Sequence, residues 1–211
     1  MTAIRTYLPR LLDGLWFHQL PEALREALLD AAVLRRLESG QRLFSRGDKP
    51  CGLYAVLEGA IRIGAVGSSG KEALLTLIEP PSWFGEIALF DGQPRTHDAY
   101  AEGATLLLNV PQPALLALLE REPRYWRDLA LLMSQKLRLA FVESLGRQID
   151  LLRRSRCDGN WHIAALRLKG LAASVKAEPL VLLAEEAIVA APGDPSVVRR
   201  LQAFLDEFAG H

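Results

Sequence analysis

The chain has 211 residues, 50% of them hydrophobic, and a formal net charge of zero at pH 7. This length accommodates one sizeable core plus a small second domain, and the composition argues against wholesale disorder. The balanced charge gives no global field that would recruit nucleic acid or an anionic membrane. Cys51 and Cys157 lie far apart with no CxxC pairing, so the sequence predicts neither a disulfide framework nor a metal site.

The chain carries no apolar stretch near the ~18 uninterrupted residues of a membrane helix, and no long apolar run follows Arg5. Its two cysteines suit a reducing compartment as structural thiols. We therefore expect a cytoplasmic protein without membrane contact.

The pattern of apolar residues changes near residue 31. Residues 1–30 carry leucines at helical spacing, which predicts two short helices. From about residue 31 to 110, glycines interrupt short apolar runs every ~8–12 residues, which is typical of an all-β sandwich or barrel. The expected strands are 42–45, 53–57, 60–66, 73–78 and 104–110, with a hairpin turn at Gly67, Ser68, Ser69 and Gly70.

Helical periodicity returns after the last expected strand. Pro111 cannot donate to a β-ladder, and residues 113–120 then read as a helix. Pro123 opens a long helix that is expected to run to about residue 152. The predicted organisation is 1–30 N-terminal helices, 31–121 β-barrel, 122–152 long helix and 153–211 α-helical region.

The most informative segment runs from Phe84 to Thr96, FGEIALFDGQPRT. Gly85 lets the backbone approach a ligand without a Cβ clash, and the next residues are expected to form a short helix whose first N–H groups face an anion. Arg95 supplies a charged fork suited to two phosphate oxygens, and Thr96 adds a hydroxyl donor. Glu86 would repel a phosphate, so we expect it to accept a hydrogen bond from another ligand group, such as a sugar hydroxyl. The alternative is a sandwich turn in which Glu86 and Arg95 form a simple salt bridge.

This segment, with the barrel pattern before it and the long helix after it, resembles the cyclic nucleotide-binding domain of the Crp/Fnr regulator family. The resemblance covers roughly residues 15–150 and includes Gly40, Gly47 and a turn at residues 57–59. It implies an α+β fold: a jelly-roll-like β-barrel (double-stranded β-helix) with N-terminal helices, a long C-helix and a small helical C-terminal region.

The resemblance also implies a ligand and its contacts. The ligand would be a cyclic nucleotide, cyclic AMP or cyclic GMP, with no further cofactor and no metal. Arg95 and Thr96 would bind the cyclic phosphate, and Glu86 would hold the ribose 2′-hydroxyl. Backbone N–H groups would come from Gly85 to Ala88. The candidate ligand-binding residues are therefore Phe84, Gly85, Glu86, Ile87, Ala88, Arg95, Thr96 and Phe141.

Two features depart from the family pattern. His97 and Asp98 follow Thr96 where the family usually has small or β-branched residues, and a protonated His97 would add charge beside a bound phosphate. The alternative is that strand alternation points them to opposite faces and at least one is simply solvated. On the long helix, Ala140 and Phe141 stand where cyclic-AMP activators carry hydroxyls; Phe141 is able to stack on a base or, alternatively, to fill a helix–helix interface.

The resemblance implies a homodimer through the long helix, and the family's DNA readers end in a winged helix-turn-helix. Residues 153–211 contain eight Lys/Arg and seven Asp/Glu, so this region lacks the excess of positive charge that is typical of a DNA-binding surface. DNA is therefore possible as a partner but unsupported by charge or motif. With no catalytic constellation apparent, we expect a regulatory protein, and not an enzyme, in which ligand binding is relayed through the long helix to the C-terminal region. The alternatives are a DNA-binding regulator with a divergent helix-turn-helix and a sensor-fold module that has lost nucleotide binding.

Overall fold

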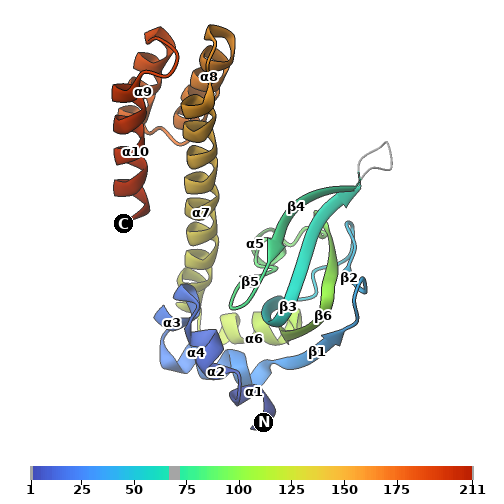
Figure 1. Cartoon of the computed structure of the whole chain (residues 1–211). Helices are drawn as coiled ribbons and strands as arrows, with labels where there is room; N and C mark the ends of the chain where they lie inside the picture. Colours follow the sequence, from blue (N-terminus) through green and yellow to red (C-terminus); the bar gives the residue numbers. More distant parts are fainter. Residues whose placement is uncertain (1, 67–71, 211) are drawn as a thin grey trace. The chain divides into compact units, whose positions relative to one another are not determined.

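The computed structural model describes residues 2–66 and 72–210, so the hairpin turn expected at 67–70 lies outside the described residues. The chain forms two compact units, Met1–Gln135 and Lys136–His211. The first combines helices with an antiparallel sheet, and the described part of the second contains helices alone (Figure 1).

The N-terminal segment forms short helices where punctuating residues divide it. Four are described instead of the two expected: α1 (Thr2–Arg5), α2 (Leu8–Leu12), α3 (Leu15–Gln19) and α4 (Glu22–Ala31). Gly14 is extended at the start of α3, and Pro21 is the N-cap of α4, so each interrupts the helical hydrogen bonding. The leucine spacing indicated helical structure in this segment but not these breaks.

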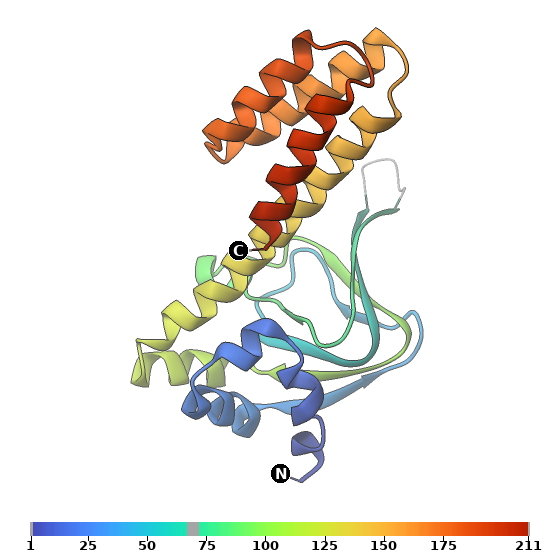
Figure 2. The ribbon, with the colours of Figure 1, turned by 60° about the vertical axis from the view of Figure 1, so that its left-hand side comes forward.

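Six strands form one antiparallel sheet with the main strand order β1-β6-β3-β4. In addition, β2 pairs with β6, and β5 pairs with β3. The strands are β1 (Val33–Leu37), β2 (Arg42–Phe44), β3 (Leu53–Val66), β4 (Glu72–Ile78), β5 (Trp83–Phe84) and β6 (Asp98–Val110). Each long strand pairs with a different short strand at each of its ends, which curls the sheet into the jelly-roll-like arrangement (Figure 2). The expected α+β class and fold are confirmed.

One expectation within this sheet is wrong. Residues 57–59 are not a turn between two strands, because β3 runs through them. Its register against β6 shifts on both sides of Glu58, as at a β-bulge. Gly59 has φ of +72°, and a Cβ there would lie 2.5 Å from the carbonyl oxygen of Ala104. The glycine therefore marks a bulge with close backbone approach, a role that sequence alone does not distinguish from a turn.

The two faces of the sheet bury different residues, as the two-residue period of a strand requires. Leu53, Ala55 and Leu57 of β3 belong to a core shared with the N-terminal helices, α6 (Gln112–Arg121) and the start of α7 (Tyr125–Arg154). The intervening Tyr54 and Val56 belong to a second cluster on the opposite face. This second cluster lies inside the curled sheet and underlies the candidate site.

The second unit has its own core. It is built from the later part of α7 with α8 (Asp158–Ser174), α9 (Glu178–Val189) and α10 (Pro195–Ala209). Trp161 is 1% exposed and donates from Nε1 to the Ala187 carbonyl oxygen at 2.6 Å, joining α8 to α9. Asp194 caps α10 by accepting from the N–H groups of Ser196 and Val197.

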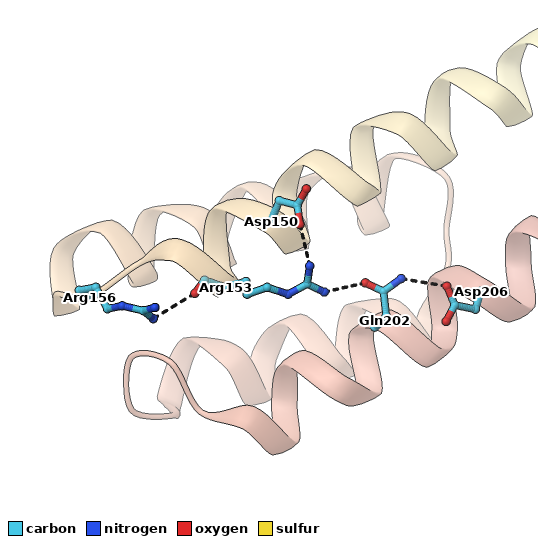
Figure 3. Close-up of polar contacts among 5 residues, drawn as sticks. All are labelled: Asp150, Arg153, Arg156, Gln202 and Asp206. Carbon is cyan, nitrogen blue, oxygen red and sulfur yellow. Dashed lines mark hydrogen bonds and ion pairs between the residues drawn. The ribbon is translucent and has the colours of Figure 1, made fainter.

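A polar chain joins the end of α7 to α10 (Figure 3). Arg153 bonds Asp150 Oδ1 and Gln202 Oε1, each at 2.9 Å, and Gln202 in turn donates to Asp206 Oδ1 at 2.8 Å. Arg156 donates to the Arg153 carbonyl oxygen. Arg153, Arg154 and Arg156 are clustered at the end of α7, and two of the three are therefore engaged within the unit.

Candidate functional site

Arg95 is buried in the first unit, with 6% of its surface exposed. Nη1 donates to the Gly85 carbonyl oxygen at 3.0 Å, and Nη2 donates to the Gly52 carbonyl oxygen at 2.8 Å and to Cys51 Sγ at 3.2 Å. Nε is buried and has no hydrogen-bond partner among the described residues. These acceptors carry no formal charge unless the thiol ionises, so the guanidinium is a buried cation held mainly by dipoles.

The Arg95 guanidinium lies over two aromatic rings. The guanidinium carbon lies 4.6 Å from the ring centroid of Phe44 and 6.0 Å from that of Tyr54. The electron-rich faces of these rings favour a positive charge above them. Tyr54 in turn donates from its hydroxyl to Cys51 Sγ at 3.2 Å. Burial, and then the contact with Cys51, raise the pKa of the Tyr54 hydroxyl, so the phenol stays neutral beneath Arg95.

Two glycines allow the chain to fold around Arg95. Gly85 has φ of +100°, and a Cβ there would lie 2.7 Å from the Gly52 carbonyl oxygen and 3.1 Å from Arg95 Nη1. Gly52 has φ of +112°, and a Cβ there would lie 2.0 Å from the Val110 carbonyl oxygen. Both positions therefore require glycine for backbone conformation and for space.

Glu86 follows Gly85, whose carbonyl oxygen accepts from Arg95, and it is 3% exposed. It precedes α5 (Ile87–Asp91), and its backbone carbonyl accepts from the N–H of Leu89 at 3.0 Å. The first N–H groups of a helical turn lack intrahelical partners, which leaves those near Ile87 and Ala88 suited to an acceptor from outside. The acceptors of Arg95 described above do not include the Glu86 carboxylate.

Thr96 and His97 form the rim of the site, because they follow Arg95 on the chain and are more exposed to solvent than it is. Thr96 is exposed, and its Oγ1 lies 2.8 Å from His97 Nδ1. Asp98 begins β6 and accepts from the Arg46 N–H at 2.9 Å. The loop after β2 is also fixed to this segment by backbone bonds, because Gly47 donates to the Arg95 carbonyl and Arg95 to that of Asp48, both at 2.8 Å.

Comparisons with known proteins identify the family. The family model described as "Cyclic nucleotide-binding domain" matches residues 34–122, which include every strand of the sheet apart from the first residue of β1. The cyclic AMP receptor protein of Thermus thermophilus is 30% identical over 207 residues, covering 92% of this chain and 95% of that protein. The chain belongs to the Crp/Fnr family.

Further comparisons agree on the sensor fold of that family. A CRP-like cAMP-activated global transcriptional regulator of Mycobacterium tuberculosis is 28% identical over 113 residues, covering 51% of this chain and 50% of that protein. The solved N-terminal domain of a transcriptional regulator from Streptomyces coelicolor is 28% identical with a TM-score of 0.53, covering 62% of this chain and 91% of that one. The sensor domain of the regulator DNR from Pseudomonas aeruginosa, at 23% identity and a TM-score of 0.54, covers 74% of this chain and 99% of that one and shows the same fold.

Most of the candidate residues of this Crp/Fnr chain lie close together in the first unit. Phe84 is 3% exposed, and its ring stacks on Tyr54 at 5.3 Å between centroids, so it supports Gly85 from beneath. Phe141 lies instead in the core of the second unit. It is 9% exposed and packs edge-on against Phe208 at 5.1 Å, the second of the two roles considered for it.

Sequence reasoning missed the residues that hold Arg95. Cys51, Gly52, Phe44 and Tyr54 come from other segments, and only the folded sheet brings them to the arginine. Gly52 directly before a buried strand was the one local signal of a close backbone approach. Across the described residues, no group of three or more His, Cys, Asp or Glu could hold a metal ion, and no helix has the length and apolarity to cross a bilayer.

Proposed function

We propose that this Crp/Fnr-family chain senses a cyclic nucleotide, of the cyclic AMP or cyclic GMP type, and is not an enzyme. The observation that carries the proposal is Arg95, a residue that is 6% exposed and whose guanidinium is held by two carbonyls and a thiol, with Nε unpartnered among the described residues. A buried cation of this kind gains most from an anion, because charge-assisted hydrogen bonds are about twice as strong as neutral ones.

Each neighbouring group has a distinct task in this proposal. Arg95 and Thr96 donate to the oxygens of the cyclic phosphate, together with backbone N–H groups from Gly85 to Ala88. The Glu86 carboxylate accepts from the ribose 2′-hydroxyl, which is a role that suits an acidic group beside an anion site. Phe84 positions Gly85 through its stacking on Tyr54.

We further propose that the ligand signal reaches the C-terminal unit through α7 and that the protein acts as a homodimer. The helix Tyr125–Arg154 begins in the first unit and contributes Phe141 and Leu145 to the core of the second. Leu137 and Leu139 on this helix are 66% and 62% exposed. Residues two apart point about 200° from each other around a helix, so these two leucines do not form one patch. The side that carries Leu137, with Met133 and Ala140 one turn away on the same face, is the one suited to contact with a second copy.

A second candidate is a DNA-binding transcription regulator. It is favoured by the similarity to the Thermus thermophilus receptor protein, which extends over 92% of this chain and therefore includes its C-terminal unit. Two observations count against it. The described residues of that unit form no strand that would serve as the wing of a winged helix-turn-helix, and the side chain of Arg200 on α10 is paired with Glu186 instead of being left for a phosphate. A salt titration of binding to random duplex DNA tests it, because a DNA reader gives a steep negative slope of log K against log salt.

Calorimetric titration with cyclic AMP, cyclic GMP and linear 5′-AMP tests the main proposal. We expect a cyclic nucleotide to bind, and we expect Arg95→Gln to weaken binding at least about tenfold, since a charge-assisted contact is lost. Arg124→Gln is the matched control, because that side chain is 71% exposed. Absence of cyclic nucleotide binding by the wild type would overturn the proposal.

A further inference from the structure

The hydroxyl of Thr96 forms a hydrogen bond with its neighbour on the chain. Thr96 Oγ1 lies 2.8 Å from His97 Nδ1, a distance at which either atom can be the donor. Thr96 is exposed at the rim, whereas His97 is half-buried beside it. A threonine hydroxyl has one proton to donate, so this bond decides whether that proton is available to a ligand.

We propose that His97 is a positioning residue that controls the direction in which Thr96 donates, so that the affinity for the cyclic phosphate rises as the pH falls. The inference rests on the proposed function of the site. With neutral His97 protonated on Nε2, Nδ1 is an acceptor and takes the single hydroxyl proton of Thr96. When His97 gains a proton, Nδ1 becomes a donor to Oγ1. The hydroxyl proton is then directed outward to a phosphate oxygen.

This coupling has a definite sign. Ligand binds better to the protein with protonated His97, so affinity is higher at about pH 5.5 than at about pH 8 and falls as the pH rises across that range. The cyclic phosphodiester is a monoanion across that range, so the ligand does not contribute to the change. A protonated His97 also adds positive charge, and the test must separate this Coulombic effect from the effect on Thr96.

The test must also allow for the charged groups on the segments next to His97. They are Asp98 at the start of β6, Arg46, Asp48 and Lys49 on the loop after β2, Arg42 and Arg62 on strands that pair with β6, and Glu86 in the site. Glu86 is the buried carboxyl among them. Any contribution from these groups persists when His97 is replaced, whereas the effect proposed here disappears.

The experiment measures the Kd for cyclic AMP at about pH 5.5 and about pH 8 in the full chain. We expect the wild type to bind about fivefold more tightly at the lower pH, the value of one ordinary hydrogen bond. His97→Ala releases the Thr96 hydroxyl permanently, so it should bind tightly at both pH values and exceed the wild type at about pH 8. Thr96→Val removes the hydroxyl but keeps the shape, and should bind weakly, with only the smaller pH dependence that charge alone gives.

His18→Ala is the matched control, because His18 is an exposed histidine of the same unit and should leave the pH profile unchanged. A pH dependence of undiminished size in Thr96→Val would show that His97 acts by charge alone and would overturn the inference. So would weaker binding of His97→Ala at the higher pH, or a pH-independent wild type. Wild type that binds no cyclic nucleotide at either pH would overturn the proposed function itself, and this inference with it.

Discussion

Gly85 and Arg95 approach each other so closely that a side chain at residue 85 would crowd the guanidinium. The Gly85 carbonyl accepts from Arg95 Nη1 at 3.0 Å, and a Cβ on Gly85 would lie 3.1 Å from the same nitrogen. Gly85 therefore also determines the space that the Arg95 side chain occupies. A ligand phosphate that reaches Arg95 has to share the guanidinium with this carbonyl.

Gly85→Ala should disturb both the fold and the site. The positive φ and the clash with the Gly52 carbonyl should cost about 1–3 kcal/mol of unfolding free energy, and displacement of Arg95 should weaken nucleotide binding. Denaturant unfolding and calorimetry measure the two effects. Gly92→Ala is the control, because Gly92 has φ of +63° with nothing within 4 Å of its added Cβ, so it should lose only about 1 kcal/mol and retain affinity. Equal losses of affinity in both variants would contradict the steric explanation.

Glu86→Gln should reveal which part of the ligand Glu86 contacts. The substitution keeps the shape but weakens an ionic acceptor, so the loss of affinity should be larger for a ribonucleotide than for its 2′-deoxy analogue. We expect a coupling of about 1 kcal/mol in a mutant-by-ligand cycle of Kd values. A coupling near zero would remove Glu86 from the ribose contact.

Leu137→Glu combined with Leu139→Glu should convert the proposed dimer to a monomer without unfolding it, because both leucines are exposed in the single chain. Light scattering gives the mass, and circular dichroism checks the fold. Phe141→Glu provides the contrast. Phe141 is buried against Phe208, so a charge there should destabilise the C-terminal unit by about 3 kcal/mol or more. An unchanged mass in the double-leucine variant would refute the interface on α7.

Truncation should distinguish two possible domain boundaries. A fragment of residues 1–135 should fold cooperatively, because it keeps the core of the first unit intact. A cut after residue 152, near the boundary expected from the sequence, leaves the α7 residues Phe141, Leu145, Ile149 and Leu152 without their partners from α8 to α10. We expect the longer fragment to self-associate more strongly in light scattering, because it exposes this apolar stripe. A longer fragment that stays monomeric with a higher melting temperature would favour the later boundary.

The sequence by itself determined the elements whose signals are local. Glycine-punctuated apolar runs indicated the curled sheet, and Pro111 marked the end of β6. The run from Gly85 to Thr96 also indicated an anion site, because glycine, arginine and threonine carry their conformational and hydrogen-bonding properties wherever they occur. Phe141 shows the limit of such reasoning. Its spacing on the helix was consistent with a ligand contact, but a residue on α10, over sixty positions later, decided what it touches.

The tertiary structure alone decided what surrounds Arg95. The arginine stacks on Phe44 from β2, lies over Tyr54 from β3 and donates to Gly52, which precedes β3. These partners are far apart in the sequence, and strand register brings them together: β2 and β3 both pair with β6, and Tyr54 faces the cluster inside the curled sheet. A period of two fixes which residues share a face, but it does not specify which strands become neighbours. The pairing of strands that are distant in the sequence therefore buries Arg95, which the sequence indicated only as an arginine in an anion-binding segment.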